Sequence, residues 1–230
     1  MNVRDVLTSR SLVGCAALAG VAAAVLVGKD GLGTVVGCGI AEDAVPSVTA
    51  KDWVSSADHV VVASPVREQE VDRREFKAGP VQYVTDRTVT FRTDRVLWSA
   101  AGRGRAVDKG FDMVAAGWSV YRESGRRVKR TTPEAPRLEP GHTYLLALRW
   151  EGGAGPDAGA GRWSVLGEGA AVPFDDRTVG RGEWCGRVLG EEDVAQAERF
   201  SRSDDHSLEK VVLGRDEQAV TGELQRARKV

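Results

Sequence analysis

The chain has 230 residues and a formal net charge of −1, with 42% hydrophobic and 28% charged residues. This composition supports one packed domain plus a terminal segment, and it excludes wholesale disorder. Without a basic excess, the chain does not have the charge of a dedicated nucleic-acid-binding protein. The three cysteines, Cys15, Cys38 and Cys185, form no CxxC pair, so no cysteine zinc site of the usual spacing is encoded.

The N-terminal residues 11–28, from Ser11 to Gly28, are an uncharged apolar run, SLVGCAALAGVAAAVLVG. As a helix, this run would be about 27 Å long, close to the hydrocarbon thickness of a bilayer. Two arginines precede the run and a single lysine follows it closely. By the positive-inside rule we expect a signal anchor over residues 1–30, making a single-pass cell-membrane protein with the N-terminus inside and the domain extracytoplasmic.

Two other fates of the N-terminus stay open. The tetrapeptide VVGC at residues 35–38 is similar to the lipobox of bacterial lipoproteins, in which the cysteine carries lipid, although two charged residues interrupt the apolar region before it. Small residues at positions 22–24 also permit cleavage of a secretory signal. In each case the domain lies outside the cytoplasm.

The first half of the domain contains stretches that predict a helix or strand clearly and stretches that do not. Residues 31–48 lack periodicity and are predicted to be a linker. Thr49 is a predicted N-cap for a helix over residues 50–56. The run HVVVASPV at residues 59–66 predicts a buried strand that ends at a proline. Residues 67–80 are densely charged, which favours a mobile loop or an exposed strand end.

The best strand in the chain is predicted over residues 87–98, RTVTFRTDRVLW. Val89, Phe91 and Leu97 share one parity, and mainly polar residues take the other. The alternation breaks before the end of the run. We therefore predict a β-bulge near residues 93–95, as a strongly curved strand often contains.

Further elements follow at short spacing. Strands are expected over residues 111–121, 142–150, 162–166, 171–179 and 183–189, with a hairpin turn at 123–125 and helices over 191–200, 207–213 and 215–228. Short antiparallel strands followed by helices predict a mainly β fold, a small antiparallel barrel or sandwich with C-terminal helices. The expected organisation is an anchor over 1–30, a linker over 31–48, a β domain over 49–190 and C-terminal helices over 191–230.

Three stretches carry a resemblance to known proteins. They are HVVVASPV at residues 59–66, TVTFRTDRVLW at 88–98 and the turn-strand EPGHTYLLAL at 139–148. They look like the netrin-module and metalloproteinase-inhibitor class of OB-like β-barrels, and more closely resemble uncharacterised membrane-anchored envelope proteins of high-GC actinobacteria. The resemblance spans about residues 59–174 and implies an OB-like barrel. Because the chain lacks the disulfide framework of those inhibitors, it does not imply inhibition.

A candidate disulfide joins Cys38 and Cys185. If the domain is exported, both residues lie in a non-reducing compartment. The bond would attach the linker to the last strand of the predicted barrel and close a long loop. Two reduced thiols, or a lipid on Cys38, are the alternatives.

Two surfaces are candidate binding sites. Trp98, Trp118 and Trp150 each stand at a predicted strand end, where they would form a stacking surface for a ligand such as a glycan, or else plug the ends of a small barrel. The second candidate is a basic cluster on the predicted hairpin, made of Arg126, Arg127, Lys129 and Arg130. It would meet an anionic partner, or else serve as a solvated strand edge.

No sequence motif assigns a catalytic residue, a metal ligand or a cofactor. The three histidines have no HExxH spacing, and no serine lies in a GxSxG motif. We therefore expect a membrane-anchored extracytoplasmic binding domain of the cell envelope, with an envelope protein, wall polymer or lipid as partner and no nucleic acid. The alternatives are an extracytoplasmic hydrolase with a site assembled from sequence-distant residues, and a purely structural role.

Overall fold

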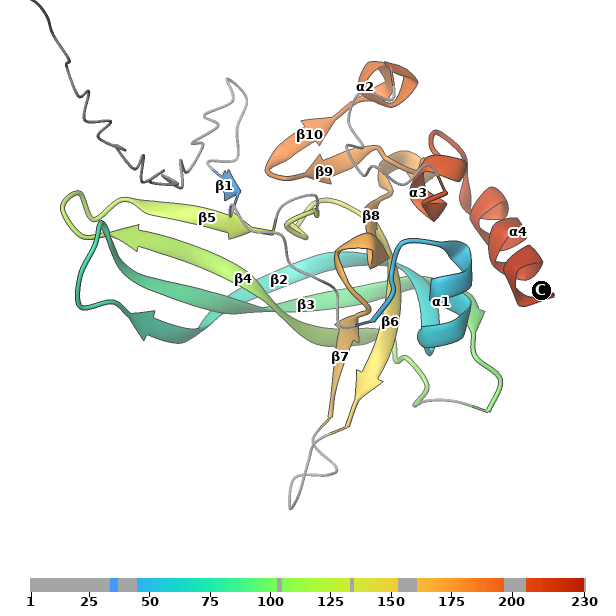
Figure 1. The fold of residues 1–230 in the computed structure, drawn as a ribbon, viewed down its shortest axis with the longest axis horizontal. Coiled ribbons are helices and arrows are strands. Elements are labelled where there is room, and N and C mark those ends of the chain that lie inside the picture. The colour runs from blue at the N-terminus through green and yellow to red at the C-terminus, as the bar shows by residue number, and fades with distance from the viewer. Residues whose placement is uncertain are drawn as a thin grey trace, which may run out of the picture.

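The computed structural model describes residues 34–36, 45–102, 105–132, 135–152, 161–196 and 206–229. One curved sheet of eight strands organises this part of the chain (Figure 1). Its main path runs in the spatial order β1 (Thr34–Val36), β5 (Arg127–Thr131), β4 (Gly110–Tyr121), β3 (Val81–Ser99), β2 (His59–Glu75), β6 (Tyr144–Glu151) and β7 (Arg162–Val165), and β8 (Ala171–Pro173) also pairs with β6. All pairings except β1–β5 are antiparallel, which confirms the predicted mainly antiparallel β fold.

The predicted barrel is wrong, because the sheet does not close. Residues 110–116 of β4 pair only with β3, and β7 pairs only with β6. These two strands approach each other on one side of the sheet, but no ladder of backbone hydrogen bonds joins them. We call this open boundary the seam. The predicted sandwich is not formed either, since the other sheet of the described residues has only two strands, β9 (Gly182–Trp184) and β10 (Arg187–Leu189).

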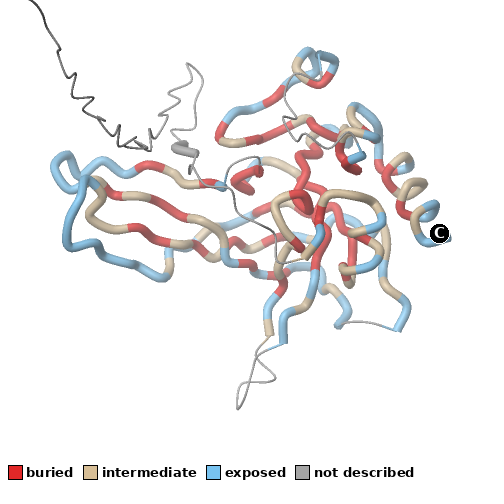
Figure 2. The backbone as a smooth tube through the Cα atoms, in the orientation of Figure 1, coloured by how far each residue is buried: buried red, intermediate tan, exposed pale blue. Residues whose placement is uncertain are grey.

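The strands β2 and β3 are far longer than expected, at 17 and 19 residues. Residues 67–75, predicted to be a loop or an exposed strand end, continue β2 up to Glu75. They do so because they pair with β3, where Arg74 also contacts the carboxylate of Asp86. The outer halves of β2 and β3, together with β4 and β5, form an arm that extends away from the core (Figure 1). Figure 2 shows that exposed residues dominate the end of this arm.

The predicted bulge in β3 is confirmed. Val62 pairs with Arg95 and Ala63 pairs with Thr93, so Asp94 is the extra residue. A second shift in register follows where β2 begins. Bulges bend a strand and increase its twist, which gives the sheet part of its curvature.

The core consists of two main clusters, one on each face of the sheet. Alternation along β2 sends Val60 and Val62 into one cluster, and Val61 and Ala63 into the other. The helices α1 (Ala50–Ser56), α3 (Leu208–Val211) and α4 (Glu217–Arg228) cover the first cluster, to which they contribute Trp53, Leu208, Val220 and Leu224. As a result, the first half of β2 is buried on both faces.

The helix α1 has the predicted bounds, and the helices expected over 207–213 and 215–228 are present as the shorter α3 and α4. Thr49 caps α1 through a capping box: its Oγ1 accepts from Asp52 N at 3.1 Å, and Asp52 Oδ2 accepts from Thr49 N at 2.8 Å. Helix α2 spans Glu191–Gln196. Among the described helices, none is both long and apolar enough to cross a membrane. The predicted anchor, residues 11–28, lies outside the described residues.

The region between β8 and β10 is less regular than predicted. Only Ala171–Pro173 of the expected strand 171–179 is extended, and a short 3₁₀ turn, η3 (Asp175–Arg177), follows it. The expected strand 183–189 is instead the hairpin of β9 and β10, with Cys185 and Gly186 in its turn. Cys185 has φ of +48° and Gly186 has φ of +76°, which produces the tight reversal.

Candidate functional site

A cavity of about 380 Å³ lies at the seam. This seam pocket has walls from β4, from β7 and from the segment that follows β5. Its apolar lining includes Met113, Ala115, Pro136, Leu138 and Val165. Small-molecule sites in proteins typically measure about 300 to 1,000 Å³ and have mainly apolar walls with a few fixed polar groups. The seam pocket therefore has the size and lining of a binding site.

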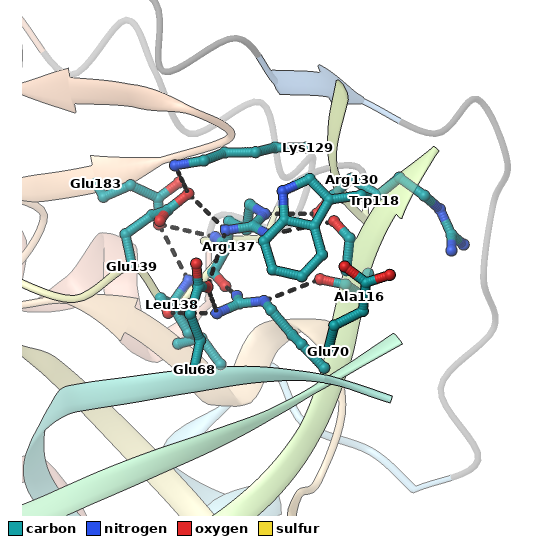
Figure 3. A network of polar contacts seen from close by, with 12 residues as sticks. Glu68, Glu70, Ala116, Trp118, Lys129, Arg130, Arg137, Leu138, Glu139 and Glu183 are labelled. Atoms are coloured by element: carbon teal, nitrogen blue, oxygen red, sulfur yellow. Dashed lines mark hydrogen bonds and ion pairs between the residues drawn. The ribbon is translucent and has the colours of Figure 1, made fainter. Parts of the chain in front are cut away.

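Two arginines, Arg130 and Arg137, and one carboxylate, Glu168, are the charged residues of the seam pocket lining. Arg130 is partly exposed and its guanidinium lies 3.7 Å from Asp86 Oδ1. Arg137 is buried, with only 1% of its side chain exposed. Its Nη1 donates to Glu139 Oε1 at 2.7 Å, and its Nη2 donates to Gly117 O at 3.2 Å. Figure 3 shows Arg137 at the centre of a network of polar contacts.

Arg87 lies beside Arg137 and is even more deeply buried, with 0% of its side chain exposed. Its Nη1 donates to Glu68 Oε2 at 2.8 Å and to Leu138 O at 3.2 Å, and its Nη2 contacts the carbonyl oxygen of Arg137. Burial, followed by the positive charge of Arg137, lowers the pKa of Arg87 to about 10. Arg87 therefore keeps its charge at neutral pH and binds the segment at 137–138 to β3.

Glu139 balances part of this charge. Its Oε1 accepts from Lys129 Nζ at 2.9 Å as well as from Arg137. Burial by itself would raise the pKa of Glu139, but the positive charges of Arg137 and Lys129 outweigh burial and lower it. The carboxylate consequently stays ionised and fixes Arg137 and Lys129 in place.

Glu183, on β9, is fully buried and holds the same segment from the other side. Its Oε2 accepts from the backbone N of Arg137 at 2.7 Å, from that of Leu138 at 3.2 Å and from the Tyr144 hydroxyl at 3.0 Å. Its Oε1 accepts from Gly186 N at 2.8 Å. Burial raises the pKa of Glu183. It also raises the pKa of Tyr144, an effect to which the negative charge of Glu183 adds.

The sequence gives one signal for this network, which our sequence analysis missed. Arg87 shares its parity with Val89 and Phe91, so it lies on the apolar face of the strand. A charged residue at such a position needs a buried partner. The partners themselves, Glu68 and the segment at 137–139, are far away in the chain and were not predictable from spacing.

The three predicted ligand-stacking tryptophans are not brought together. Trp98 packs against the first core cluster and Trp150 against the second, on opposite faces of the sheet. Trp118 lies beside Arg137 in the polar network (Figure 3). The guanidinium of Arg127 is 3.9 Å from the Trp118 ring centroid, and that of Arg137 is 5.0 Å away. Trp118 is therefore enclosed by cations rather than exposed to a ligand.

The predicted basic patch lies on β5 and the turn before it, but carboxylates of the chain itself contact three of its four members. Arg127 pairs with Glu70 at 2.5 Å, Lys129 with Glu139 at 2.9 Å and Arg130 with Asp86 at 3.7 Å. Arg126 instead lies over the ring of Tyr121, 5.5 Å from its centroid. Most of the charge of this patch is thus compensated within the domain.

Of the predicted disulfide pair, Cys38 lies outside the described residues. Cys185 lies in the turn between β9 and β10, and its Sγ donates to Ala135 O at 3.4 Å. Ala135 lines the seam pocket. The thiol of Cys185 is therefore next to the proposed binding site.

A second polar cluster lies at the start of β6. His142 Nδ1 and Asp175 Oδ2 are 2.6 Å apart, and Asp175 Oδ1 accepts from Thr143 N at 2.7 Å. The hydrogen bond to Asp175 raises the pKa of His142. Ser64 is close by, with its Oγ 3.2 Å from Thr143 Oγ1, but it donates to Asp94 Oδ2 at 2.6 Å. Among the described residues, no hydrogen bond joins Ser64 to His142.

Within the described part of the chain, no three His, Cys, Asp or Glu residues form a group that could hold a metal ion. The seam pocket instead offers apolar contact and guanidinium donors, which suit a ligand that is partly apolar and partly anionic. No protein family matches the chain, and no curated protein matches it in sequence.

Proposed function

We propose that this chain is a membrane-anchored extracytoplasmic binding domain of the cell envelope, and that its ligand binds in the seam pocket. The observation that carries the proposal is the cavity of about 380 Å³ at the seam, whose mainly apolar lining includes Arg130 and Arg137. Apolar walls gain free energy by burying ligand surface, and a guanidinium orients an acidic group. An envelope protein, a wall polymer or a lipid component that combines these two features is the proposed class of partner.

The rigidity of the pocket supports a binding role. Glu183 holds the backbone of Arg137 and Leu138, and Arg87 holds their carbonyl oxygens. Both residues are buried, so their hydrogen bonds do not compete with water. A wall that is fixed before the ligand arrives loses little conformational entropy on binding.

A fluorescent probe with an aromatic body and one sulfonate, 8-anilinonaphthalene-1-sulfonate, tests the pocket. We expect saturable binding by the full chain, and an affinity reduced about tenfold in Ala115→Phe, whose side chain occupies the cavity. Val188→Phe is the matched control, because Val188 is exposed on β10, outside the pocket lining. Equal affinity of Ala115→Phe and the wild-type chain, with unchanged circular dichroism, would contradict the proposal.

The membrane location rests on the apolar run at residues 11–28 and is tested separately. Intact mass of the protein from the membrane fraction distinguishes the three fates of the N-terminus. A full-length mass supports the anchor. A mass that begins at Cys38 and includes lipid identifies a lipoprotein instead, and a mass without the apolar run and without lipid indicates a cleaved signal.

The hydrolase alternative is favoured by the pair of His142 and Asp175 beside Ser64. A carboxylate that holds one nitrogen of an imidazole leaves the other nitrogen to act as a general base. Hydrolysis of p-nitrophenyl acetate that is lost in both Ser64→Ala and His142→Ala would favour an enzyme. If the wild-type chain and both variants hydrolyse the ester no faster than buffer does, the result favours the binding domain over the enzyme.

A further inference from the structure

Two turns meet at the end of the arm farthest from the core (Figure 1). They are residues 76–80, between β2 and β3, and residues 122–126, between β4 and β5, and together we call them the arm tip. Arg122 joins them: its Nη2 donates to Phe76 O at 2.5 Å, its Nε to Gly79 O at 3.2 Å and its backbone N to Pro80 O at 2.8 Å. The arm tip is therefore one structural unit rather than two separate loops.

The arm tip exposes a large aromatic side chain. Phe76 is 47% exposed, although its backbone N donates to Gln82 O at 2.8 Å and holds it in the turn. An aromatic side chain held at a protruding turn is placed to enter the headgroup region of a bilayer, where burial removes its apolar surface from water.

The charge around Phe76 is positive. Residues 72–80 and 121–126 contain five cations, Arg73, Arg74, Lys77, Arg122 and Arg126, and three carboxylates, Asp72, Glu75 and Glu123, so their net charge is +2. The whole chain has a net charge of −1. Among the described residues, Lys77 and Arg126 form no ion pair. These two side chains are available to an anionic surface.

The register of β1 places its N-terminal end on the side of the arm tip. Thr34 pairs with Lys129 in a parallel ladder, so Thr34 is the end of β1 that lies toward the beginning of β5. Lys129 is three residues after Arg126, a distance of about 10 Å along a strand. Only residues 29–33 separate the predicted membrane segment from β1, and five residues span at most about 18 Å.

We propose that the arm tip docks on an anionic membrane surface, with Phe76 in the headgroup region and Lys77 and Arg126 against lipid phosphates. This inference rests on the proposed function only in taking residues 11–28 as a membrane anchor. Cations near an anionic bilayer add attraction to the apolar contact. Docking at the tip holds the domain in one orientation, with the seam pocket at the other end of the arm and away from the bilayer.

Hydrogen exchange of the full chain in lipid nanodiscs tests the docking. The discs contain either phosphatidylcholine alone or phosphatidylcholine with about 30% phosphatidylglycerol. We expect amides of residues 76–79 and 122–126 to exchange about fivefold more slowly in the anionic discs, because the bilayer shields them from solvent. Amides of α4 report on the remainder of the domain, and their exchange rates should be the same in both kinds of disc.

A pair of variants isolates the surface. F76S/K77E changes one exposed apolar residue and one cation at the arm tip, whereas V188S/R187E makes the same kinds of change on exposed residues of β10. Loss of the protection in F76S/K77E and its retention in V188S/R187E support docking. Equal exchange in the two kinds of disc, or protection that survives F76S/K77E, overturns it.

The experiments can contradict the proposed anchor and the proposed docking independently of each other. A chain that does not stay in neutral discs lacks the anchor, which contradicts the proposed location. In that case, sedimentation of the full chain with anionic vesicles tests the arm tip directly, and failure to sediment overturns docking. Protection induced in neutral discs by soluble polyphosphate alone, and not by anionic lipid, assigns the surface to an anionic polymer and also overturns membrane docking.

Discussion

Arg127 on β5 and Glu70 on β2 form an ion pair of 2.5 Å, although β3 and β4 lie between their strands in the sheet. In a flat sheet, strands three positions apart are about 14 Å from each other. Their side chains meet because the arm is strongly curled. Trp118, Arg87 and Arg137 lie within this curl, which therefore encloses the buried charges.

Gly117 is expected to be essential for this curl. A Cβ at Gly117 would lie 2.7 Å from Thr85 O and 2.8 Å from Asp86 O. We expect Gly117→Ala to lower the free energy of unfolding by about 1–3 kcal/mol, because the backbone must move to make room. Urea unfolding measures the change.

The control for this substitution is Gly222 in α4, where a Cβ would meet nothing within 4 Å. Gly222→Ala should raise the free energy of unfolding by about 0.5–1 kcal/mol, since alanine loses less backbone entropy in a helix. Equal shifts of the urea midpoint in both variants would contradict the assignment of Gly117 as a close-approach position.

The carboxylate of Glu183 is expected to stabilise the pocket wall. Both carboxylate oxygens of Glu183 face only N–H or O–H donors. In Glu183→Gln, an NH₂ group replaces one of these oxygens. A buried donor that faces donors stays unsatisfied, so the free energy of unfolding should fall by about 2–3 kcal/mol. Glu192→Gln, on the exposed side of α2, should change it by less than about 0.5 kcal/mol. A similar loss in both variants would indicate a general effect of charge.

Stability should depend on pH through His142. The Asp175 hydrogen bond raises the pKa of His142, and the charges of Asp175 and Glu183 add to the rise against burial. A raised histidine pKa stabilises the folded state at low pH, and this contribution is lost as pH rises from about 6.5 through the raised value. Asp175→Asn keeps an acceptor for Thr143 N but removes the charge. Urea unfolding measured from acidic to alkaline pH should therefore show a smaller loss of the free energy of unfolding in Asp175→Asn than in the wild-type chain. Parallel pH profiles of the two proteins would refute this prediction.

A disulfide between Cys38 and Cys185 stays a prediction, and the register of β1 supports its reach. Val36 pairs with Thr131, whose Oγ1 donates to Ala135 O at 3.3 Å, and Cys185 Sγ contacts the same carbonyl oxygen at 3.4 Å. Cys38 follows Val36 by two residues, a reach of about 7 Å. We expect both cysteines to become alkylated only after reduction, as measured by peptide mass.

The variant Cys185→Ser should make Cys38 alkylated without reduction, whereas Cys15→Ser should leave the pattern unchanged. Alkylation of both Cys38 and Cys185 in the unreduced wild-type protein would exclude the bond. A lipid on Cys38 would exclude it as well.

Local patterns were enough to predict several elements. The helix at Ala50–Ser56 follows from Thr49 as its N-cap, and the structure adds Asp52, which completes the capping box. The strand that begins at His59 follows from a continuous apolar run, and the bulge at Asp94 follows from an alternation that is interrupted. These features depend on backbone hydrogen bonds and side-chain periods that involve only neighbouring residues, so spacing in the chain reveals them.

Tertiary packing alone decided that the sheet stays open, that charged residues up to Glu75 remain in β2, and that Arg87 and Arg137 are buried together. The partners of these arginines come from β2, from the segment after β5 and, through Glu183, from β9. A buried charge is stable only where distant segments supply its hydrogen bonds. No local sequence period encodes contacts between distant segments, so the seam pocket and the burial of its arginines could be identified only from the tertiary structure.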